Sequence, residues 1–221
     1  MKCMINNEKI KEFGLVRCDP YLFFSSKLVK DNANMVEIGT RSGQHIINLC
    51  QMFHGKIIAY EAGRQNYIDL MTAIKGLPAI AHNCAVTGKD GEVSFFEFAE
   101  RSSNSIYPRH INEGRRLNEE VVIRSISVEN ILKENDIDYI DVLFSNCEGA
   151  ELNILHEVLC KPSLREKIGQ LCISFHGNKI YPKQKEVDLV EKMSEFYVVI
   201  EDITAFPCHL FIRKDLYNEN K

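Results

Sequence analysis

The sequence predicts an α/β protein built on a doubly wound, mostly parallel sheet that ends in a C-terminal antiparallel hairpin. From residue 35 onward, short apolar runs alternate with amphipathic segments of helical spacing, which is typical of β-α-β units with helices on both faces of the sheet. The last two apolar runs, residues 197–203 and 208–213, have only a short connection between them and are expected to pair as the hairpin. A chain of 221 residues suits one domain of this kind.

The composition is that of a soluble globular protein, with 45% hydrophobic and 26% charged residues. The formal net charge of -4 gives no reason to expect nucleic acid or an anionic membrane as a partner. No apolar run approaches the roughly 20 residues that span a bilayer, and the first residues lack the apolar stretch of a secretory signal. The 8 cysteines form no CxxC pair, so we expect reduced cysteines, no zinc site and a cytoplasmic protein.

Residues 1–32 precede the alternation and are expected to form an N-terminal helical cap on the main domain, residues 33–221. Short helices are expected in this cap at residues 9–13 and 21–29. The strands expected next are residues 35–38, 56–61, 79–86 and 92–98, and the helices between them are residues 43–53 and 65–75.

Residues 99–120 form a long polar connection, and connections of this length inside a compact domain are usually functional or mobile. The segment is expected to be either a solvated loop or a lid that recognises a polar acceptor, and its basic residues are Arg101, Arg109, His110, Arg115 and Arg116. After it, strands are expected at residues 121–127, 137–145 and 171–175, and helices at residues 128–135, 149–159 and 183–196. Ser127 is the expected N-cap of the first of these helices.

Two turns at the ends of neighbouring predicted strands indicate a nucleotide-like ligand. Gly39 and Gly43 follow the first strand and allow backbone N–H groups to approach a ligand closely. Glu61 ends the second strand, 22 residues beyond Gly39, which is about the spacing at which an acid binds the ribose hydroxyls of a dinucleotide. The alternative is a plain tight turn with a surface carboxylate. Together the glycines and Glu61 favour an adenosine-type cofactor.

The residues around the first turn distinguish between cofactors. A dinucleotide pyrophosphate favours GxGxxG and no nearby negative charge, whereas here Gln44 and Ile46 leave that pattern incomplete and Glu37 precedes the turn. S-adenosylmethionine has no phosphate and carries a sulfonium and an ammonium, both of which a carboxylate attracts. Glu37 therefore favours S-adenosylmethionine over a nicotinamide cofactor. No GxxxxGK[ST] occurs, which excludes a P-loop.

Several further segments follow in an order and spacing more specific than a glycine turn alone. They are VEIGTRSG (36–43), AYEA (59–62), NCAV (83–86), DGE (90–92), SVENIL (127–132) and IDYIDVLFSNCEGAE (137–151), with His176 after the next strand. In these segments the chain resembles class I methyltransferases of the FkbM type, over roughly residues 33–177.

The resemblance implies a Rossmann-like sheet of seven strands, S-adenosylmethionine as methyl donor, and a hydroxyl acceptor on a saccharide or other small natural product. By position it implies that Glu37, Gly39, Thr40 and Gly43 surround the methionine part, that Glu61 holds the ribose, and that Asn83 and Cys84 flank the adenine. Arg41 and Ala62 complete the cofactor-binding residues that we expect.

The chain departs from the family pattern at five positions, and the mildest departure is Glu37, where the family has an aspartate. Arg41 replaces an asparagine, Phe144 a lysine, Asn146 an aspartate and Ser174 an acid. The last three departures are expected to lie on the acceptor side of the site, where they put the acceptor and the catalytic base in question.

Three residues just after predicted strands are the catalytic candidates: Asn146, Glu148 and His176. His176 has the intrinsic pKa of a base near neutral pH, or else is a structural histidine bonded within its loop. Glu148 precedes a helix and is as well suited to capping it as to catalysis. Asn146 can orient an acceptor but cannot accept its proton. A metal site that adds Asp141 is not expected, because strand alternation points Asp141 elsewhere.

Two functions remain open. The first is O-methylation of a saccharide or similar small molecule, and the second is a binding module that keeps the fold and the S-adenosylmethionine site without the chemistry. A nicotinamide oxidoreductase is disfavoured by Glu37 and the incomplete glycine pattern. The oligomeric state is left open, and the N-terminal segment and the final hairpin are the candidate contact surfaces of a homo-oligomer.

Overall fold

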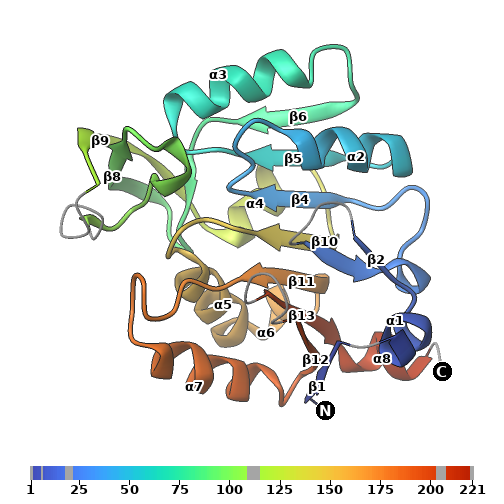
Figure 1. The fold of residues 1–221 in the computed structure, drawn as a ribbon. Coiled ribbons are helices and arrows are strands. Elements are labelled where there is room, and N and C mark those ends of the chain that lie inside the picture. Colours follow the sequence, from blue (N-terminus) through green and yellow to red (C-terminus); the bar gives the residue numbers. More distant parts are fainter. Residues whose placement is uncertain (1, 6, 18–21, 109–114, 203–207, 220–221) are drawn as a thin grey trace.

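The central feature of the computed structural model is one eight-stranded sheet (Figure 1). The structure describes residues 2–5, 7–17, 22–108, 115–202 and 208–219. The strand order is β1 (Lys2–Met4), β12 (Tyr197–Asp202), β13 (Cys208–Arg213), β11 (Ile168–Ser174), β10 (Ile140–Ser145), β4 (Met35–Ile38), β5 (Ile57–Tyr60) and β6 (Ala79–His82). Only β13 runs antiparallel to its neighbours β11 and β12. The doubly wound, mostly parallel sheet of seven strands and its C-terminal antiparallel hairpin are therefore confirmed, and β1 adds an eighth strand at the edge.

Helices cover both faces of this sheet. On one face, α4 (Val128–Glu134), α5 (Glu151–Cys160) and α7 (Lys183–Met193) contribute to one buried cluster, with the short α6 (Pro162–Arg165) after α5. On the other face lie α1 (Asn7–Phe13), α2 (Gln44–Met52), α3 (Arg64–Ala73) and α8 (Lys214–Glu219). Within the described ranges, no helix is both long and apolar enough to cross a membrane.

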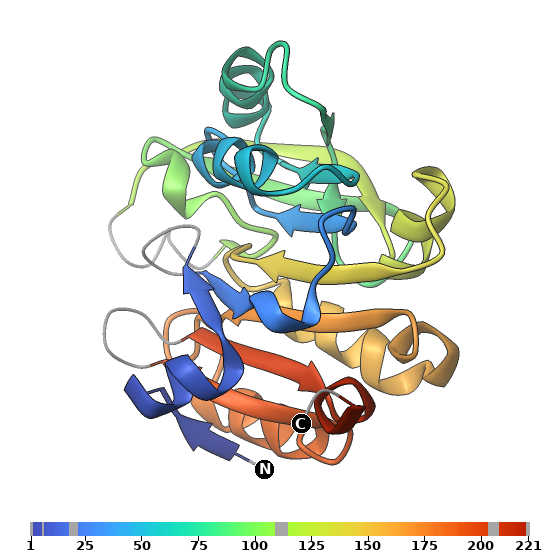
Figure 2. The ribbon, with the colours of Figure 1, turned by 90° about the vertical axis from the view of Figure 1, so that its right-hand side faces the viewer.

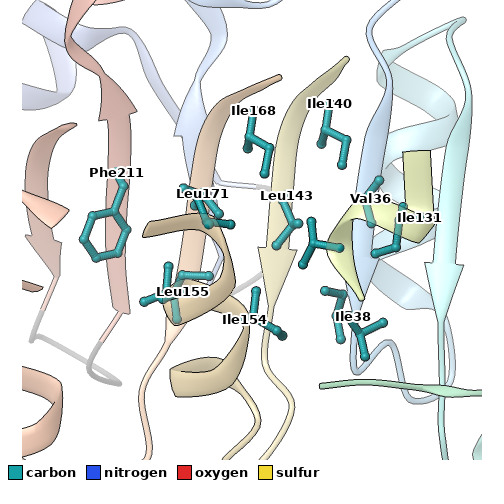
Figure 3. Close-up of a cluster of buried hydrophobic side chains, with 14 of the residues drawn as sticks. Val36, Ile38, Ile131, Ile140, Leu143, Ile154, Leu155, Ile168, Leu171 and Phe211 are labelled. Carbon is teal, nitrogen blue, oxygen red and sulfur yellow. The ribbon is translucent and has the colours of Figure 1, made fainter. Parts of the chain in front are cut away.

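The core explains why most strands read as unbroken apolar runs. Every residue of β4, β5 and β11 is buried, as expected for strands that have helices on both sides. Figure 3 shows Ile131, Ile154 and Leu155 from the helices of one face against the side chains of β4, β10 and β11.

A second, three-stranded sheet stands beside the carboxyl ends of the main strands. It contains β7 (Ala85–Val86), β9 (Leu117–Ile126) and β8 (Gly91–Phe98), in that order. The prediction of one strand over residues 79–86 was wrong, because β6 ends at His82 and β7 pairs with β9 instead. The predicted start of β9 at residue 121 was also late. Its first residues are polar and mostly exposed, so they carry no apolar pattern.

The N-terminal segment mixes helix and strand. The helix predicted near residues 9–13 is confirmed as α1, but the helix predicted over residues 21–29 was wrong in the part that the structure describes. That part forms β3 (Phe23–Ser25), which pairs with β2 (Leu15–Arg17), and a 3-10 turn, η1 (Ser26–Leu28). The reason is tertiary: the Ser25 backbone bonds both ends of the Gln170 side-chain amide in β11. A domain boundary near residue 32 stays a prediction.

The two ends of the chain meet on one face of the sheet. Phe13 of α1 stacks on Tyr217 of α8 with ring centroids 5.2 Å apart, and the terminal segments lie side by side in both views (Figures 1 and 2).

The helix α4 begins as predicted, since the Ser127 hydroxyl accepts a hydrogen bond from the Asn130 backbone N–H at 3.1 Å.

Candidate active site

A cavity of about 320 Å³ lies at the carboxyl ends of β4, β5 and β10, where doubly wound sheets bind their ligands. This volume falls in the range of small-molecule sites. Its wall includes the predicted residues Gly39, Arg41, Glu61, Ala62, Cys84, Asn146 and Glu148. The other predicted site residues, Glu37, Thr40, Gly43, Asn83 and His176, are not part of the wall.

The glycine turn is shaped by contacts within the protein. Gly39 has φ 82°, and a Cβ there would collide with the backbone oxygen of Asn146, so only glycine fits. Gly43, the N-cap of α2, has φ 83°, and a Cβ there would lie 2.5 Å from Leu70 Cδ1. The Thr40 hydroxyl donates to the backbone oxygen of Tyr60 at 3.1 Å. Gly43 and Thr40 therefore set the shape of the turn, while Gly39 also forms part of the cavity wall.

Glu61 is the buried acid on the cofactor side of the cavity. Only 4% of its surface is exposed. Its carboxylate accepts hydrogen bonds from the backbone N–H of Arg41 at 2.8 Å and of Gly63 at 2.9 Å. Burial raises the pKa of Glu61 to about 7, although these bonds act in the opposite direction. The group therefore titrates near neutral pH and can accept further hydrogen bonds from a ligand when it is ionised.

Arg41 takes a left-handed backbone conformation, with φ 52°. Its side chain is exposed at the edge of the cavity. Within the described residues, no ion pair joins its guanidinium to a carboxylate. Arg41 is therefore a cation at the cavity that is available to an anionic group.

Beyond Glu61 the cavity is mostly apolar. Cys84, Val86, Phe95 and Ile106 line this part. Burial raises the pKa of the Cys84 thiol to about 11, so it is neutral at physiological pH. Asn83 lies behind the wall, where its side-chain amide donates to the backbone oxygens of Glu61 and Ala62 at 2.8 and 3.1 Å.

The side chain of Glu37 lies in a different place from the one expected from the sequence. It alternates with Ile38, which lines the cavity, and therefore points to the opposite face of the sheet. There its Oε2 lies 3.0 Å from Nδ1 of the buried His45 in α2. The Glu37 carboxylate is therefore not part of the cavity wall, and its expected contact with the cofactor stays a prediction. Phe144, its neighbour in register on β10, packs in the same core and is not on the acceptor side as predicted.

The turn after β10 supplies the other polar end of the cavity. Asn146 and Glu148 line it. Glu148 has a left-handed φ of 48°, and its backbone oxygen accepts a hydrogen bond from the Ser105 hydroxyl at 2.6 Å. A carboxylate on the β10 turn thus shares one cavity with Glu61 on the β5 turn.

His176 lies behind Glu148 and is 2% exposed. Its Nε2 is 3.1 Å from Glu148 Oε1, and its Nδ1 is 3.0 Å from Glu151 Oε1. Burial lowers the pKa of His176, but the hydrogen bonds and negative charges of Glu148 and Glu151 outweigh burial and raise it to about 9. At neutral pH the ring is therefore an imidazolium. The two carboxylates thus favour the protonated ring, which makes His176 less suited to accepting a proton than its intrinsic pKa indicates.

The remaining candidates lie away from the cavity. Ser174 is fully buried in β11 and is not part of the wall. Asp141 accepts the Asn34 backbone N–H at 2.8 Å, near the opposite end of β10. Across the described part of the chain, no group of three His, Cys, Asp or Glu side chains is arranged to hold a metal ion.

Sequence reasoning missed part of the wall. The residues it did not single out include Asn66, Phe95, Ser102, Asn104 and Ile106. Three of these five belong to the polar segment after β8, as does the wall residue Arg101, so the polarity of that segment was the available signal. Arg115 instead bonds Glu100 and Ser103, and Arg109 and His110 lie outside the described residues.

Comparisons with known proteins agree with this fold. The family model described as methyltransferase FkbM domain matches residues 37–198. Among solved structures, the Methanococcus jannaschii fibrillarin pre-rRNA processing protein is similar with a TM-score of 0.51 and 12% identity, over 91% of this chain and 71% of that chain. An rRNA methylase from Streptococcus thermophilus is similar with a TM-score of 0.50 and 9% identity, over 85% and 91% of the two chains. No curated protein matches the sequence.

These similarities show that the fold is that of a class I methyltransferase. At such low sequence identity they show the fold alone. The family match covers most of the chain, and the chain belongs to the methyltransferase FkbM domain family. It is therefore an S-adenosylmethionine-dependent methyltransferase by family and fold.

The ion pairs of His176 predict a specific dependence of stability on pH. Because folding raises its pKa from 6.5 to about 9, its stabilising contribution is complete below pH 6.5 and is lost as the pH rises through 9. We expect wild-type protein to lose about 3 kcal/mol of unfolding free energy across this window relative to His176→Gln. Urea unfolding of both proteins at several pH values measures the difference, and parallel pH profiles would contradict it.

Proposed function

We propose that the protein transfers a methyl group from S-adenosylmethionine to a hydroxyl oxygen of a saccharide or another small natural product. The observation that carries this proposal is that two carboxylates from different strand ends, Glu61 and Glu148, line one cavity. A buried acid beside a glycine turn suits the ribose end of the cofactor. A second acid farther along the wall suits the acceptor.

The residues present fit the cofactor. The Glu61 carboxylate would accept hydrogen bonds from the ribose hydroxyls, and the apolar wall at Cys84, Val86 and Phe95 would hold the adenine. Gly39 would border the methionine part, and the Arg41 guanidinium would pair with its carboxylate. Thr40, Gly43, Asn83 and Glu37 support these elements from behind the wall and are not assigned a contact.

Glu148 is the proposed base of the reaction, with Asn146 orienting the acceptor hydroxyl. The bound cofactor supplies an electrophilic methyl group on a sulfonium. Glu148 would accept the proton that the hydroxyl loses as its oxygen bonds to the methyl carbon, while the bond between that carbon and sulfur breaks and S-adenosylhomocysteine leaves. His176 would position Glu148 through its Nε2 and would take no proton itself.

A small acceptor fits the site better than a nucleic acid. Two of the similar structures are a pre-rRNA processing protein and an rRNA methylase. A chain that binds RNA through its phosphates needs a basic surface, and this chain has a formal net charge of -4. The charge balance therefore supports the saccharide or small-molecule proposal.

One observation favours the second candidate, a binding module without activity. The imidazolium of His176 lies 3.1 Å from Glu148 and stabilises its ionised form, which makes that carboxylate a weaker base. The cavity would then bind the cofactor without promoting transfer.

Calorimetry tests the cofactor assignment. We expect S-adenosylmethionine and S-adenosylhomocysteine to bind and NAD not to bind. Glu61→Gln should weaken binding by about 1–3 kcal/mol, because a neutral amide replaces the carboxylate that accepts hydrogen bonds from the two ribose hydroxyls. Wild-type affinity should fall as the pH drops below about 7, where Glu61 becomes protonated, and this dependence should disappear in Glu61→Gln. Glu120→Gln, on the exposed part of β9, is the matched control. Unchanged affinity in Glu61→Gln would remove Glu61 from the site.

Transfer of a labelled methyl group tests the reaction. The probes are a panel of saccharides and small hydroxylated compounds, together with a cell extract. For an acceptor that is methylated, Glu148→Gln should lower the rate about 100-fold or more, as expected for loss of a general base. A rate equal to that of the wild type would show that Glu148 is not the base. Cofactor binding without transfer to any probe would support the binding module instead.

A further inference from the structure

Glu151 is a fully buried carboxylate that no step of the proposed reaction uses. It is the first residue of α5, and its surface is 0% exposed. It does not line the cavity. Burying a carboxylate is costly unless its charge and hydrogen bonds are satisfied, so the groups that surround Glu151 indicate its role.

Four hydrogen bonds with N–H and O–H groups converge on the two oxygens of Glu151, and the Cys147 thiol donates a fifth to Oε2 at 3.7 Å. Oε1 accepts from the backbone N–H of His176 at 3.0 Å and from the Tyr181 hydroxyl at 2.6 Å, and it lies 3.0 Å from His176 Nδ1. Oε2 accepts from the backbone N–H of Gly149 at 2.7 Å. Glu151 thus joins the turn after β10 to the loop after β11.

These contacts continue into the cavity through one side chain. The imidazole of His176 uses Nδ1 for Glu151 and Nε2 for Glu148, so its two nitrogens bridge two carboxylates. Glu148 lies in the cavity wall, and Gly149, whose N–H is held by Glu151, is the next residue in the chain. The position of the Glu148 carboxylate therefore depends on Glu151 through both the imidazole and the backbone.

The charges of Glu151 and His176 also support the dependence of Glu148 on Glu151. Burial alone would raise the pKa of Glu151, yet the bonds from His176 and Tyr181 hold it below its ordinary value. The buried anion keeps His176 protonated, and a protonated ring can donate to both carboxylates at once. Among the described residues, the groups that contact His176 include Glu148, Glu151 and Tyr181.

We infer that Glu151 is a positioning residue: with Tyr181, it holds the His176 imidazolium so that this cation fixes the Glu148 carboxylate in the cavity. This inference rests on the proposed function for the role of Glu148. A carboxylate that only capped α5 would need its bond to Gly149 but not the bridge through His176. The two roles therefore predict different behaviour of the histidine.

The first test is an NMR pH titration of the His176 ring in the full chain without ligand. In Glu151→Gln we expect its pKa to fall from about 9 by at least one unit, a tenfold change in proton affinity, because the neutral amide no longer holds the proton. Glu157→Gln is the matched control, since Glu157 is another buried glutamate of α5 but bonds the start of α4 instead. Its His176 should titrate as in the wild type. An unchanged pKa in Glu151→Gln, or an equal fall in Glu157→Gln, would overturn the inference.

Tyr181→Phe separates charge from general disruption, and it serves if Glu151→Gln does not fold. It removes one donor to Glu151 but keeps the anion, which then attracts the imidazole proton more strongly. We expect the pKa of His176 to stay the same or rise. A fall in this variant would show that loosening the network, rather than losing its charge, lowers the pKa, and would overturn the inference.

The second test asks whether Glu151 acts on the cavity. S-adenosylmethionine carries a positive sulfur and S-adenosylhomocysteine does not, so a fixed Glu148 carboxylate should favour the former. We expect Glu148→Gln and Glu151→Gln each to reduce the ratio of the two affinities several-fold, with Glu157→Gln at the wild-type ratio. A wild-type ratio in Glu151→Gln would overturn the inference. If neither compound binds the wild type, the proposed function fails, while the His176 titration still tests the bridge itself.

Discussion

The carboxylate of Glu61 ties together the turns that follow two neighbouring strands. It receives the N–H of Arg41 from the turn after β4 and the N–H of Gly63 from the turn after β5. The Arg41 N–H is presented to it by a turn in which Gly39 and Arg41 both have positive φ. A buried carboxylate without hydrogen-bond donors would be costly. Glu61 therefore needs the N–H groups that the glycine turn presents, and the turn needs Glu61 to accept them.

The second acid of the cavity is held in a different way. Neutral backbone groups satisfy Glu61, and its pKa rises to about 7. Glu148 instead lies against a buried cation, His176, which is held in turn by Glu151. One carboxylate is therefore held by neutral backbone donors, whereas the other lies beside a charged ring. This difference suits hydrogen bonding to a ribose at one end of the cavity and an interaction with a positively charged group at the other.

The sequence predicted the architecture well because strand and helix periodicity follow directly from burial on two faces. It located the glycine turn, Glu61 and the turn with Asn146 and Glu148, because in a parallel sheet the carboxyl ends of neighbouring strands meet at one edge. The sequence did not reveal that Glu37 lies outside the cavity wall, because one residue of alternation decides which face a side chain occupies, and Glu37 pairs with His45 on the far side. The pattern over residues 79–86 did not reveal that β6 ends at His82 in one sheet and that β7 begins at Ala85 in another.

The state of His176 could not be predicted from its position after a strand. Its intrinsic pKa suggested a base, and only the distances to Glu148 and Glu151 show a ring held between two anions. Likewise, the helix predicted over residues 21–29 was excluded by a long-range contact, the bonding of Ser25 to Gln170 in β11. Such contacts join residues far apart in the chain, and local propensity carries no information about them.

A crystal structure with S-adenosylhomocysteine bound tests the central claim most directly, because it shows which acids face the ligand. The account predicts ribose hydroxyls within hydrogen-bond distance of Glu61, the adenine beside Cys84, and the sulfur on the side of the cavity that Glu148 occupies. A ligand seated elsewhere, or one whose ribose contacts no carboxylate oxygen of Glu61, would contradict it.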